Sequence, residues 1–386
     1  MTYDVIIIGA GLVGASVAAA LADTPLRLAI VEREPPRDGG GGEWDSRIYA
    51  ISPASRGFLE SVGAWQGLDP ARIQPVRRME IRGDRDAQLA FSAYETGVAA
   101  LAYIVESRAM QQRFWRGLES QENLDVVCPA RCAALAREEG GWRLVLEDGR
   151  RLVGKLVVGA DGTRSWVRET AGLKAKMSPY GHQGVVANFA CERPHDGAAS
   201  QWFRADGVLA YLPLPGDRMS MVWSTPDAHA AELLALSPAA LCDQVASAGQ
   251  GRLGKLSLVT APAAFPLALM QVERLAVAGL ALVGDAAHVV HPLAGQGVNL
   301  GFADARVLAA LIREREVFRE PGDPTLMRRY ERARAEDILA MRVVTHGLQR
   351  LFSLPGRIPA TMRNLGLNLT DDLAVLKGLL VRHALG

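Results

Sequence analysis

The stretch "YDVIIIGAGLVGASVAAALA", residues 3–22, decides the fold. Its β-branched run, residues 5–8, predicts a buried parallel strand, and the small-residue run that follows predicts a helix. Between the two, Gly9, Gly11 and Gly14 form a G-x-G-x-x-G turn. The first glycine permits the tight turn, the second lets a pyrophosphate approach the backbone, and the third lets the helix pack on the strand. The stretch therefore predicts a dinucleotide-binding unit.

A second apolar run, "LRLAIVER" at residues 26–33, supports this prediction. It ends in Glu32, where an acid binds the ribose hydroxyls of an adenine dinucleotide. A glycine-rich turn that binds nothing is the alternative, but strand, glycines, helix and acid all agree with binding. The ligand is then NAD or FAD. The predicted contacts at this end are Gly9, Gly11, Leu12, Val13, Gly14, Glu32 and Arg33.

Length and composition set limits on the class of protein. The chain has 386 residues, 49% hydrophobic and 22% charged, with a net charge of +1. This predicts a globular enzyme of one large or two smaller domains and gives no reason to expect nucleic-acid binding. Neither a signal peptide nor an apolar run long enough for a membrane span is evident, so we expect a cytoplasmic protein. Four scattered cysteines complete neither a zinc pattern nor a C-x-x-C pair, which predicts reduced thiols.

The stretch "LVGDAAHVVHPLAGQGVNLG", residues 282–301, favours FAD over NAD. A strand ending in Asp285 and a helix beginning near Val298 would point a second positive helix end at an anion. A reduced flavin carries such a charge, and the backbone N–H groups of Gly297, Val298 and Asn299 could stabilise it. Asp285 could bind a ribityl hydroxyl. A plain NAD dehydrogenase needs no second cradle of this kind.

The histidines of this stretch invite a metal or a catalytic dyad as alternatives. Asp285, His288 and His291 are metal-ligand types, but a site needs three or four convergent ligands and a glycine-rich loop shows no convergence. No Ser or Cys with motif context completes a nucleophilic relay. We therefore expect no metal, a hydrogen-bonded His288, and a His291 held extended by Pro292.

Further stretches carry a family resemblance. "VGADGTRSWVR" around Asp161 joins the two glycine-rich motifs, and the set resembles the single-component FAD aromatic hydroxylases, similar in organisation to para-hydroxybenzoate hydroxylase. "DSRIYAISPASRGFLESVGAW", "AYIVESRAMQQRFW" and "HPLAGQGVNLGFADARVL" look more specifically like the ubiquinone-biosynthesis hydroxylases. The likeness covers nearly the whole chain.

The resemblance implies an α/β fold with a Rossmann-type FAD-binding domain, an inserted β-sheet substrate domain and C-terminal helices. The FAD domain would comprise residues 1–75, 98–180 and 268–350, the substrate domain 76–97 and 181–267, and the helical segment 351–386. Family positions near the cofactor fall on Arg47, Arg108, Asp161, Asp285, Gly295, Gly297, Val298 and Asn299. The positions against the reacting ring system fall on Pro292, Gly297, Val298 and Asn299.

The chemistry implied by the resemblance is ring hydroxylation. NAD(P)H reduces FAD, O2 converts it to a flavin C4a-hydroperoxide, and this oxygenates a polyprenylated phenol or benzoquinol of ubiquinone biosynthesis. A second G-x-G-x-x-G unit is absent from the sequence, which agrees with transient binding of the nicotinamide.

The β-rich middle of the chain would form the substrate pocket. Candidate lining residues are Phe203, Tyr211, Pro213, Met221 and Trp223, although each type is more often core than pocket. Residues 39–42, four glycines, predict a flexible loop that serves substrate entry or is a tolerated insertion. The amphipathic stretch at residues 371–386 is typical of a helix docked on its own core, or of one touching a membrane surface or a biosynthetic complex.

Two other functions compete with ubiquinone-ring hydroxylation. The same fold could hydroxylate a soluble aromatic, reduce a lipid or halogenate a substrate, although the halogenase W-x-W-x-I-P segment is absent. A non-catalytic, flavin-stabilised member of a biosynthetic complex is the third hypothesis.

Overall fold

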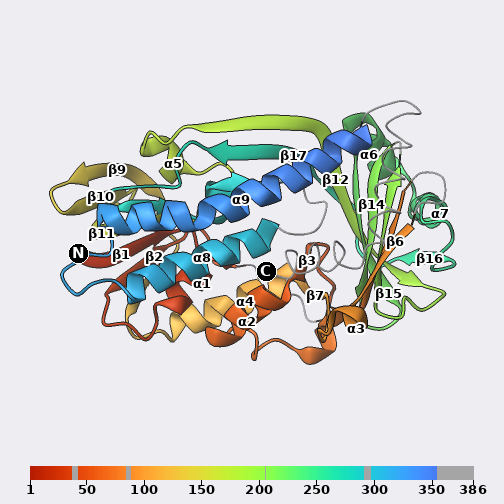
Figure 1. Cartoon of the computed structure of the whole chain (residues 1–386), viewed down its shortest axis with the longest axis horizontal. Helices are drawn as coiled ribbons and strands as arrows, with labels where there is room; N and C mark the ends of the chain where they lie inside the picture. Colours follow the sequence, from red (N-terminus) through yellow and green to blue (C-terminus); the bar gives the residue numbers. More distant parts are fainter. Residues whose placement is uncertain (37–41, 84–87, 205, 291–296, 354–386) are drawn as a thin grey trace.

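The chain forms an elongated molecule with an α/β body at one end and a large antiparallel sheet at the other (Figure 1). The computed structural model describes residues 1–36, 42–83, 88–204, 206–290 and 297–353, the last thirteen of these through their backbone alone. The expected α/β fold with an inserted β sheet is confirmed.

The first sheet contains the predicted nucleotide-binding strand at its centre. In spatial order its strands are β18 (Ala276–Val277), β19 (Leu280–Leu282), β11 (Arg151–Gly159), β1 (Thr2–Ile8), β2 (Leu28–Val31) and β8 (Leu124–Val127), with β9 (Cys132–Glu138) and β10 (Gly141–Leu146) extending from β11. Strands β19, β11, β1, β2 and β8 run parallel, so their carboxyl ends meet at one edge. Ligands of open α/β sheets bind at that edge.

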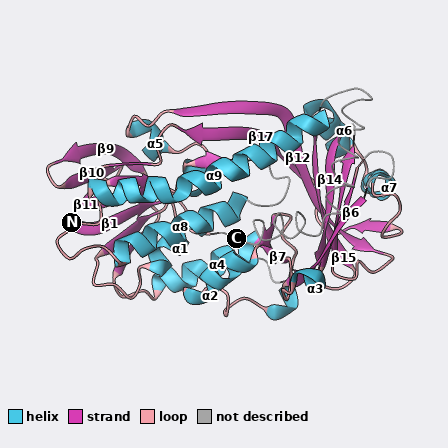
Figure 2. Cartoon of the chain, in the orientation of Figure 1, coloured by secondary structure: helices cyan, strands magenta, loops and turns pink. Residues whose placement is uncertain are grey.

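Helices cover one face of this sheet, and the β9–β10 hairpin and α5 (Trp166–Thr170) cover the other (Figure 2). The covering helices are α1 (Leu12–Ala20), α4 (Ser107–Glu119), α8 (Gly297–Arg313) and α9 (Pro324–Ser353), with α2 (Pro53–Ser61) beside α8. Because both faces are buried, β1 reads as a continuous apolar run rather than an alternating one.

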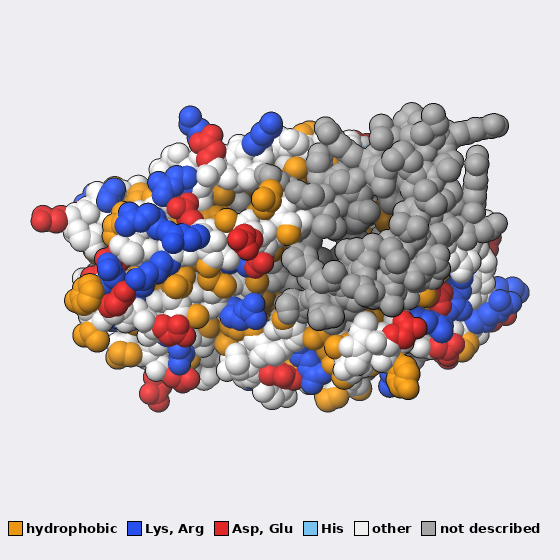
Figure 3. Space-filling model, in the orientation of Figure 1, with side chains coloured by type: hydrophobic (Ala, Val, Ile, Leu, Met, Phe, Trp, Pro, Cys, Tyr) orange, Lys and Arg blue, Asp and Glu red, His pale blue; other side chains and the backbone are white. Residues whose placement is uncertain are grey.

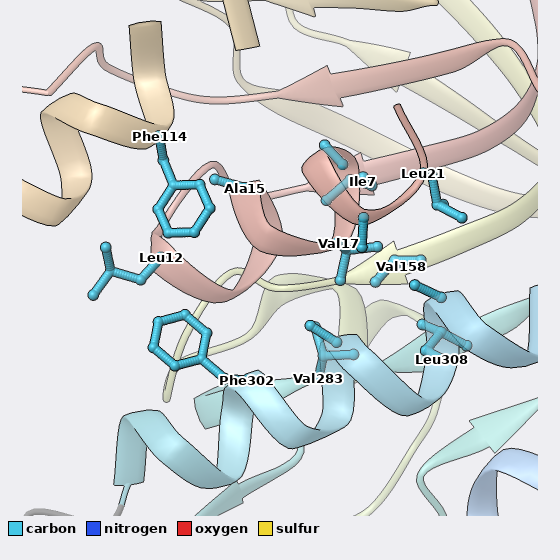
Figure 4. Close-up of a cluster of buried hydrophobic side chains, with 14 of the residues drawn as sticks. Ile7, Leu12, Ala15, Val17, Leu21, Phe114, Val158, Val283, Phe302 and Leu308 are labelled. Atoms are coloured by element: carbon cyan, nitrogen blue, oxygen red, sulfur yellow. The ribbon is translucent and has the colours of Figure 1, made fainter. Parts of the chain in front are cut away.

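The core between α1, α4 and α8 is closed by aromatic side chains. Phe302 of α8 lies with its ring centroid 6.5 Å from that of Phe114 and 6.3 Å from that of Phe58. Leu12 at the start of α1 points into the same cluster (Figure 4). This packing fixes the direction of α1 and α8, whose N-termini carry the two glycine-rich motifs.

The second sheet forms the other end of the molecule. Its order is β20 (His288–Val289), β17 (Ala263–Val272), β12 (Ala175–Cys191), β15 (Arg218–Pro226), β14 (Gly207–Leu214), β13 (Ala198–Arg204), β5 (Arg78–Arg82) and β6 (Gln88–Ser92), with β16 (Leu256–Leu258) paired to β12. Helices α6 (Asp227–Ala235) and α7 (Pro238–Ala248) pack on its outer face, and α3 (Ala93–Thr96) follows β6.

A small third sheet joins the two ends. It consists of β3 (Ile48–Ile51), β7 (Ala102–Glu106) and β4 (Gln74–Val76), and the 3-10 turn η1 (Pro70–Arg72) directly precedes β4.

Strands β12 and β17 form a long ribbon that crosses the expected domain boundaries at 180 and 268, and α9 crosses the one at 350. The domain limits therefore stay a prediction.

The described surface mixes charges of both signs. Arg329 pairs with Glu316 and Arg274 with Glu331, and blue and red side chains lie interspersed in Figure 3. No helix within the described ranges combines the length and apolar character needed to cross a membrane. Residues 371–386 lie outside the described part.

Candidate functional site

The first glycine cradle has the geometry expected of a phosphate-binding turn. Gly9 adopts a φ of +102°, and a Cβ there would lie 2.5 Å from the carbonyl oxygen of Ala160. A Cβ on Gly14 would lie 1.9 Å from the carbonyl oxygen of Gly9, so α1 touches the strand backbone at this point. Gly11 faces open space. Thus two glycines allow close packing, and the third leaves the backbone approachable from outside.

The N-terminus of α1 is free to receive an anion. Its N-cap is Gly11, which provides no side-chain cap for the first N–H groups. Glu32 accepts a hydrogen bond from the backbone N of Ala10 at 2.6 Å, through Oε2. Gln111 of α4 donates to the Ala10 carbonyl, also at 2.6 Å. Glu32 therefore lies beside the turn as predicted, whereas Gln111, distant in sequence, was missed.

The second glycine cradle is locked directly to the first. After β19 the chain forms a 3-10 turn, η2 (Gly284–Ala286), and α8 begins at Gly297, one residue before the expected start. The Val13 side chain of α1 packs against two glycines of the second cradle. A Cβ added to Gly284 would lie 3.1 Å from Val13, and a Cβ added to Gly301 would lie 2.6 Å from it. Val13 thus serves to join the cradles. Leu12 is buried in the core, and any cofactor contact by Leu12 or Val13 falls to their backbone.

Asp285 lies in the turn η2 of the second cradle and is exposed to solvent. Nearby protein atoms raise the pKa of its carboxyl by desolvation, while His288, Arg47 and a hydrogen bond from Thr163 oppose the rise. This exposed carboxylate is therefore accessible to a polar group of a bound ligand.

A buried ionic network supports the second cradle. Asp304 of α8 is fully buried and accepts hydrogen bonds from the Gly284 backbone N at 2.9 Å and from His288 Nε2 at 2.7 Å. Its other oxygen binds Arg334 Nε of α9 at 2.7 Å. Burial alone would raise the pKa of Asp304, but His288 and Arg334 outweigh it and hold the pKa below its usual value. His288 is thus hydrogen-bonded, as predicted, but it lies in the short strand β20 rather than in a loop.

The described residues contain no cluster of three or more His, Cys, Asp and Glu side chains suited to hold a metal. His291, Pro292 and Gly295 lie outside the described part of the chain, as does most of the glycine run at residues 39–42. Gly297, Val298 and Asn299 form the first turn of α8.

The side chain of Asn299 fastens α8 to β3. It accepts from the Ser52 backbone N at 3.0 Å and donates to the Ala50 carbonyl at 2.8 Å. These two hydrogen bonds fix the first turn of α8, and an anion-binding role for Asn299 stays a prediction.

Asp161 has a structural task. Its two carboxylate oxygens accept from Ser165 Oγ and from the Val167 backbone N at 3.0 Å, which fixes the start of α5. Arg168, 5% exposed, donates to the carbonyls of Thr163 and Ala286, each at 3.0 Å, and so ties the Asp161 loop to the second cradle. A cofactor contact through the Asp161 carboxylate stays a prediction.

Four of the five predicted pocket residues lie on the outer face of the second sheet, which packs against α6 and α7, so a pocket role for them stays a prediction that this packing does not support. Tyr211, Met221 and Trp223 pack into a cluster with α6 and α7, and the Tyr211 hydroxyl donates to the Val245 carbonyl. Pro213 shares this face by strand alternation. Phe203 has the opposite parity and lies on the inner face.

The inner face is identified by its contacts with the α/β body. Asn188 of β12 donates to the Asp45 carbonyl at 2.8 Å, and Ala199 and Leu214 share a cluster with Val76 and Ile104 of the third sheet. By strand alternation and register, the same face carries the apolar or small residues Gly184, Val186, Val208, Ala210, Leu212, Val222 and Phe265, and also the polar residues Gln201, Ser220 and Ser224. Phe265 is 41% exposed. The sequence did not single out this face because apolar residues occur on both faces of the strands.

Comparison with known proteins supports the two-cradle geometry. Residues 2–345 match the model of an FAD-binding domain family. The chain is 35% identical to ubiquinone hydroxylase UbiL of Rhodospirillum rubrum, over 99% of this chain and 89% of UbiL. It is 34% identical to 3-demethoxyubiquinol 3-hydroxylase of Escherichia coli, over 99% of this chain and 98% of that protein. The chain belongs to the FAD-dependent ubiquinone-biosynthesis hydroxylases.

Membership of this family makes the protein an FAD-dependent monooxygenase, as the sequence predicts. The fold is shared more widely. The structure of PqsL from P. aeruginosa in complex with 2-aminobenzoylacetate superimposes with a TM-score of 0.78 at 22% identity, over 95% of this chain and 99% of PqsL. The open backbone at Gly11, the start of α1 without a side-chain cap and the exposed carboxylate of Asp285 fit an FAD molecule that extends between the cradles.

Proposed function

We propose that this protein hydroxylates the ring of a polyprenylated phenol or benzoquinol in ubiquinone biosynthesis, with O2 as oxidant and NAD(P)H as electron donor. The observation that carries the proposal is the end-to-end similarity to 3-demethoxyubiquinol 3-hydroxylase, which extends through both cradles and the inserted sheet. FAD supplies the redox chemistry, and the protein supplies binding, orientation and electrostatics.

The residues that would hold FAD lie in three places. Glu32 at the end of β2 would bind the ribose, and the N–H groups at the start of α1 would bind the pyrophosphate. Asp285 would bind the ribityl chain, with Arg47 and Arg108 nearby. The first turn of α8, Gly297 to Asn299, would stabilise negative charge on the flavin through its backbone N–H groups.

The inner face of the second sheet is the proposed site of the substrate ring. Its side chains are small and apolar at Ala210, Val222 and Gly184, which leaves room for a flat ring, and the exposed Phe265 offers an aromatic contact. An apolar enclosure also excludes water from the reacting centre, which protects an oxygenating intermediate from wasteful breakdown. Phe203 is the one residue of the earlier pocket set that keeps this place.

The test is the quinone profile of a strain lacking the protein, measured by mass spectrometry of lipid extracts. The proposal expects accumulation of a prenylated ring compound one oxygen short, and the site of the missing oxygen identifies the position hydroxylated. The matched control is the same strain carrying the wild-type protein. A normal profile in a strain without a redundant hydroxylase would contradict the ubiquinone assignment.

Purified protein separates the remaining alternatives. Hydroxylation of a short-chain prenylated phenol, with consumption of NAD(P)H and O2, is the expected result. Turnover of simple soluble phenols with a kcat/KM comparable to that for the prenylated phenol would instead show that the enzyme acts on a soluble aromatic substrate. FAD binding without coupled oxidation of any ring compound would support a non-catalytic role.

A further inference from the structure

Asp45 occupies an unusual junction between the two ends of the molecule. Each of its polar groups has a partner, and these partners lie in three segments: the one that contains Asp45 itself, the junction of β7 and α4, and β12. One carboxylate oxygen accepts from the Arg47 backbone N at 3.0 Å, and the other from the Arg108 backbone N at 2.9 Å. The backbone N donates to Glu106 at 2.7 Å, and the carbonyl accepts from Asn188 of the second sheet at 2.8 Å.

We propose that Asp45 is a positioning residue for FAD, which sets Arg47 and Arg108 in register with each other and connects both to the second sheet. The proposal rests on the placement of these two arginines at FAD. Asp45 itself would not touch the cofactor, because both of its carboxylate oxygens are bonded to backbone N–H groups.

The start of α4 shows why an aspartate is needed at this position. The N-cap of α4 is Glu106, but its side chain does not cap the helix. Instead, Glu106 binds Arg72 through two hydrogen bonds of 2.7 and 2.8 Å and accepts from Asp45. Asp45 in return caps the helix from another segment, through the Arg108 N–H. The exchange resembles a capping box whose two acids come from different parts of the chain.

The same carboxylate fixes the entry of β3. Arg47 immediately precedes β3, and its carbonyl accepts from the Ser107 backbone N at 2.9 Å. The Arg47 guanidinium lies 5.5 Å from the ring centre of Tyr49 and close enough to Asp285 to oppose the rise in that carboxyl's pKa. Among the described residues, the Arg108 guanidinium has no hydrogen-bond or ion-pair partner. It is therefore available to an anionic ligand.

A second layer holds Asp45 in place. Arg72 donates to the carbonyls of Gly42 and Glu43 at 3.2 and 3.1 Å and lies 4.0 Å above the Trp44 ring. The Glu106 side chain that Arg72 binds is only 4% exposed. Since Asn188 reaches Asp45 from the sheet proposed to bind the substrate ring, a shift of that sheet would be transmitted to both arginines through one residue.

The experiment compares Asp45→Asn with wild type by titrating FAD into the apoprotein. The asparagine keeps one acceptor oxygen, so the fold is retained, but its amide NH2 faces one of the two N–H donors. We expect Kd for FAD to rise about tenfold, the effect of one lost charge-assisted hydrogen bond. The visible circular dichroism of bound flavin should change as well. Asp148→Asn, which alters an exposed hairpin carboxylate that also accepts a backbone N–H, is the matched control.

Two further measurements separate positioning from a merely structural role. In an Arg47→Ala background the Asp45→Asn effect on Kd should shrink, because the residue it positions is absent. Apoprotein Tm should change less than holoprotein Tm. An unchanged Kd and flavin spectrum, or equal losses of Tm in apo and holo forms, would overturn the proposal.

The proposal can fail independently of the proposed function. If Arg47→Ala and Arg108→Ala both leave Kd for FAD unchanged, the placement of the arginines is wrong and the inference falls with it. If they raise Kd and Asp45→Asn does not, only the inference fails. None of these titrations uses a hydroxylation substrate, so they do not depend on which ring the enzyme oxidises.

Discussion

The two glycine cradles meet at one edge of the same sheet but are held by different forces. The first, residues 9–14, relies on close backbone packing, since a Cβ on Gly14 would approach the Gly9 oxygen to 1.9 Å. The second, residues 284–301, relies on buried charge, with Asp304 joining Gly284 and His288 to Arg334. The first tolerates almost no added volume at Gly9 and Gly14, and the second depends on the buried carboxylate of Asp304.

The difference follows from the connections of each cradle. The first joins a strand directly to a helix, so three glycines and a helix start are sufficient to shape it. The second spans the longer stretch between η2 and α8, and its turn is fixed by contacts from two helices. Buried ion pairs are costly to break because one partner is left as an uncompensated charge.

The largest expected effect comes from Asp304→Asn. It removes the buried one of the two carboxylates that pair with Arg334 and leaves only the half-exposed Asp337, so we expect a loss of about 3 kcal/mol in the free energy of unfolding, the lower end of the range for a broken buried ion pair. Chemical denaturation of the apoprotein measures this loss. Asp148→Asn, on the surface, should change stability by less than about 0.5 kcal/mol. Equal effects of the two substitutions would remove the distinction between the cradles.

The same carboxylate predicts a pH dependence. Because the folded-state pKa of Asp304 lies below its unfolded value, its stabilising contribution is present above the unfolded pKa and is lost as pH falls through the folded pKa. The stability gap between wild type and Asp304→Asn should therefore be full at neutral pH and narrow below about pH 4. A gap that widens in acid would contradict the assigned shift.

Gly14→Ala tests the first cradle. The added methyl would collide with strand backbone, which cannot move away as a flexible side chain can, so we expect a loss near the upper end of overpacking, about 3 kcal/mol. FAD binding should fall as α1 is displaced. Thermal unfolding of the apoprotein measures the loss of stability. A Gly14→Ala apoprotein as stable as wild type would show that α1 and the strand do not pack as closely as described.

Gly11→Ala tests the first cradle by changing FAD binding without changing the stability of the apoprotein. Gly11 has a φ of −64° and ψ of 177°, which alanine adopts easily, and its Cβ would meet no protein atom. Apoprotein Tm should therefore be unchanged, while Kd for FAD rises by about tenfold or more because the methyl occupies the approach of the pyrophosphate. Equal FAD affinity would place the phosphates elsewhere.

Glu32→Gln has the smallest expected effect. The amide oxygen can still accept from the Ala10 N–H, but the NH2 group would face the Arg33 N–H that now donates to Oε1 at 2.7 Å, and the negative charge offered to the ribose is lost. We expect Kd for FAD to rise about fivefold, or about 1 kcal/mol. Glu34→Gln, on the exposed partner of Arg33, is the matched control and should have no effect. A larger loss of FAD affinity with Glu34→Gln than with Glu32→Gln would show that Glu34, and not Glu32, binds the ribose.

The sequence by itself determined the elements that depend on local contacts. Residues 5–14, the position of Glu32 and the start of a helix near Val298 follow from glycine geometry, strand periodicity and chain distance, all of which can be read from neighbouring residues. Residues 282–301 favoured FAD over NAD, the family resemblance added the inserted sheet, and the comparisons confirm both family and fold.

Only the tertiary structure decided which distant residues meet. Asp304 and Arg334 are 30 positions apart, and nothing local marks them as a pair. The sequence also did not show that Tyr211, Met221 and Trp223 pack against α6 and α7, because both faces of the second sheet contact other parts of the chain, one face α6 and α7 and the other the α/β body. Strand alternation separates two faces but does not say which packs where, since that depends on what the rest of the chain lays against each.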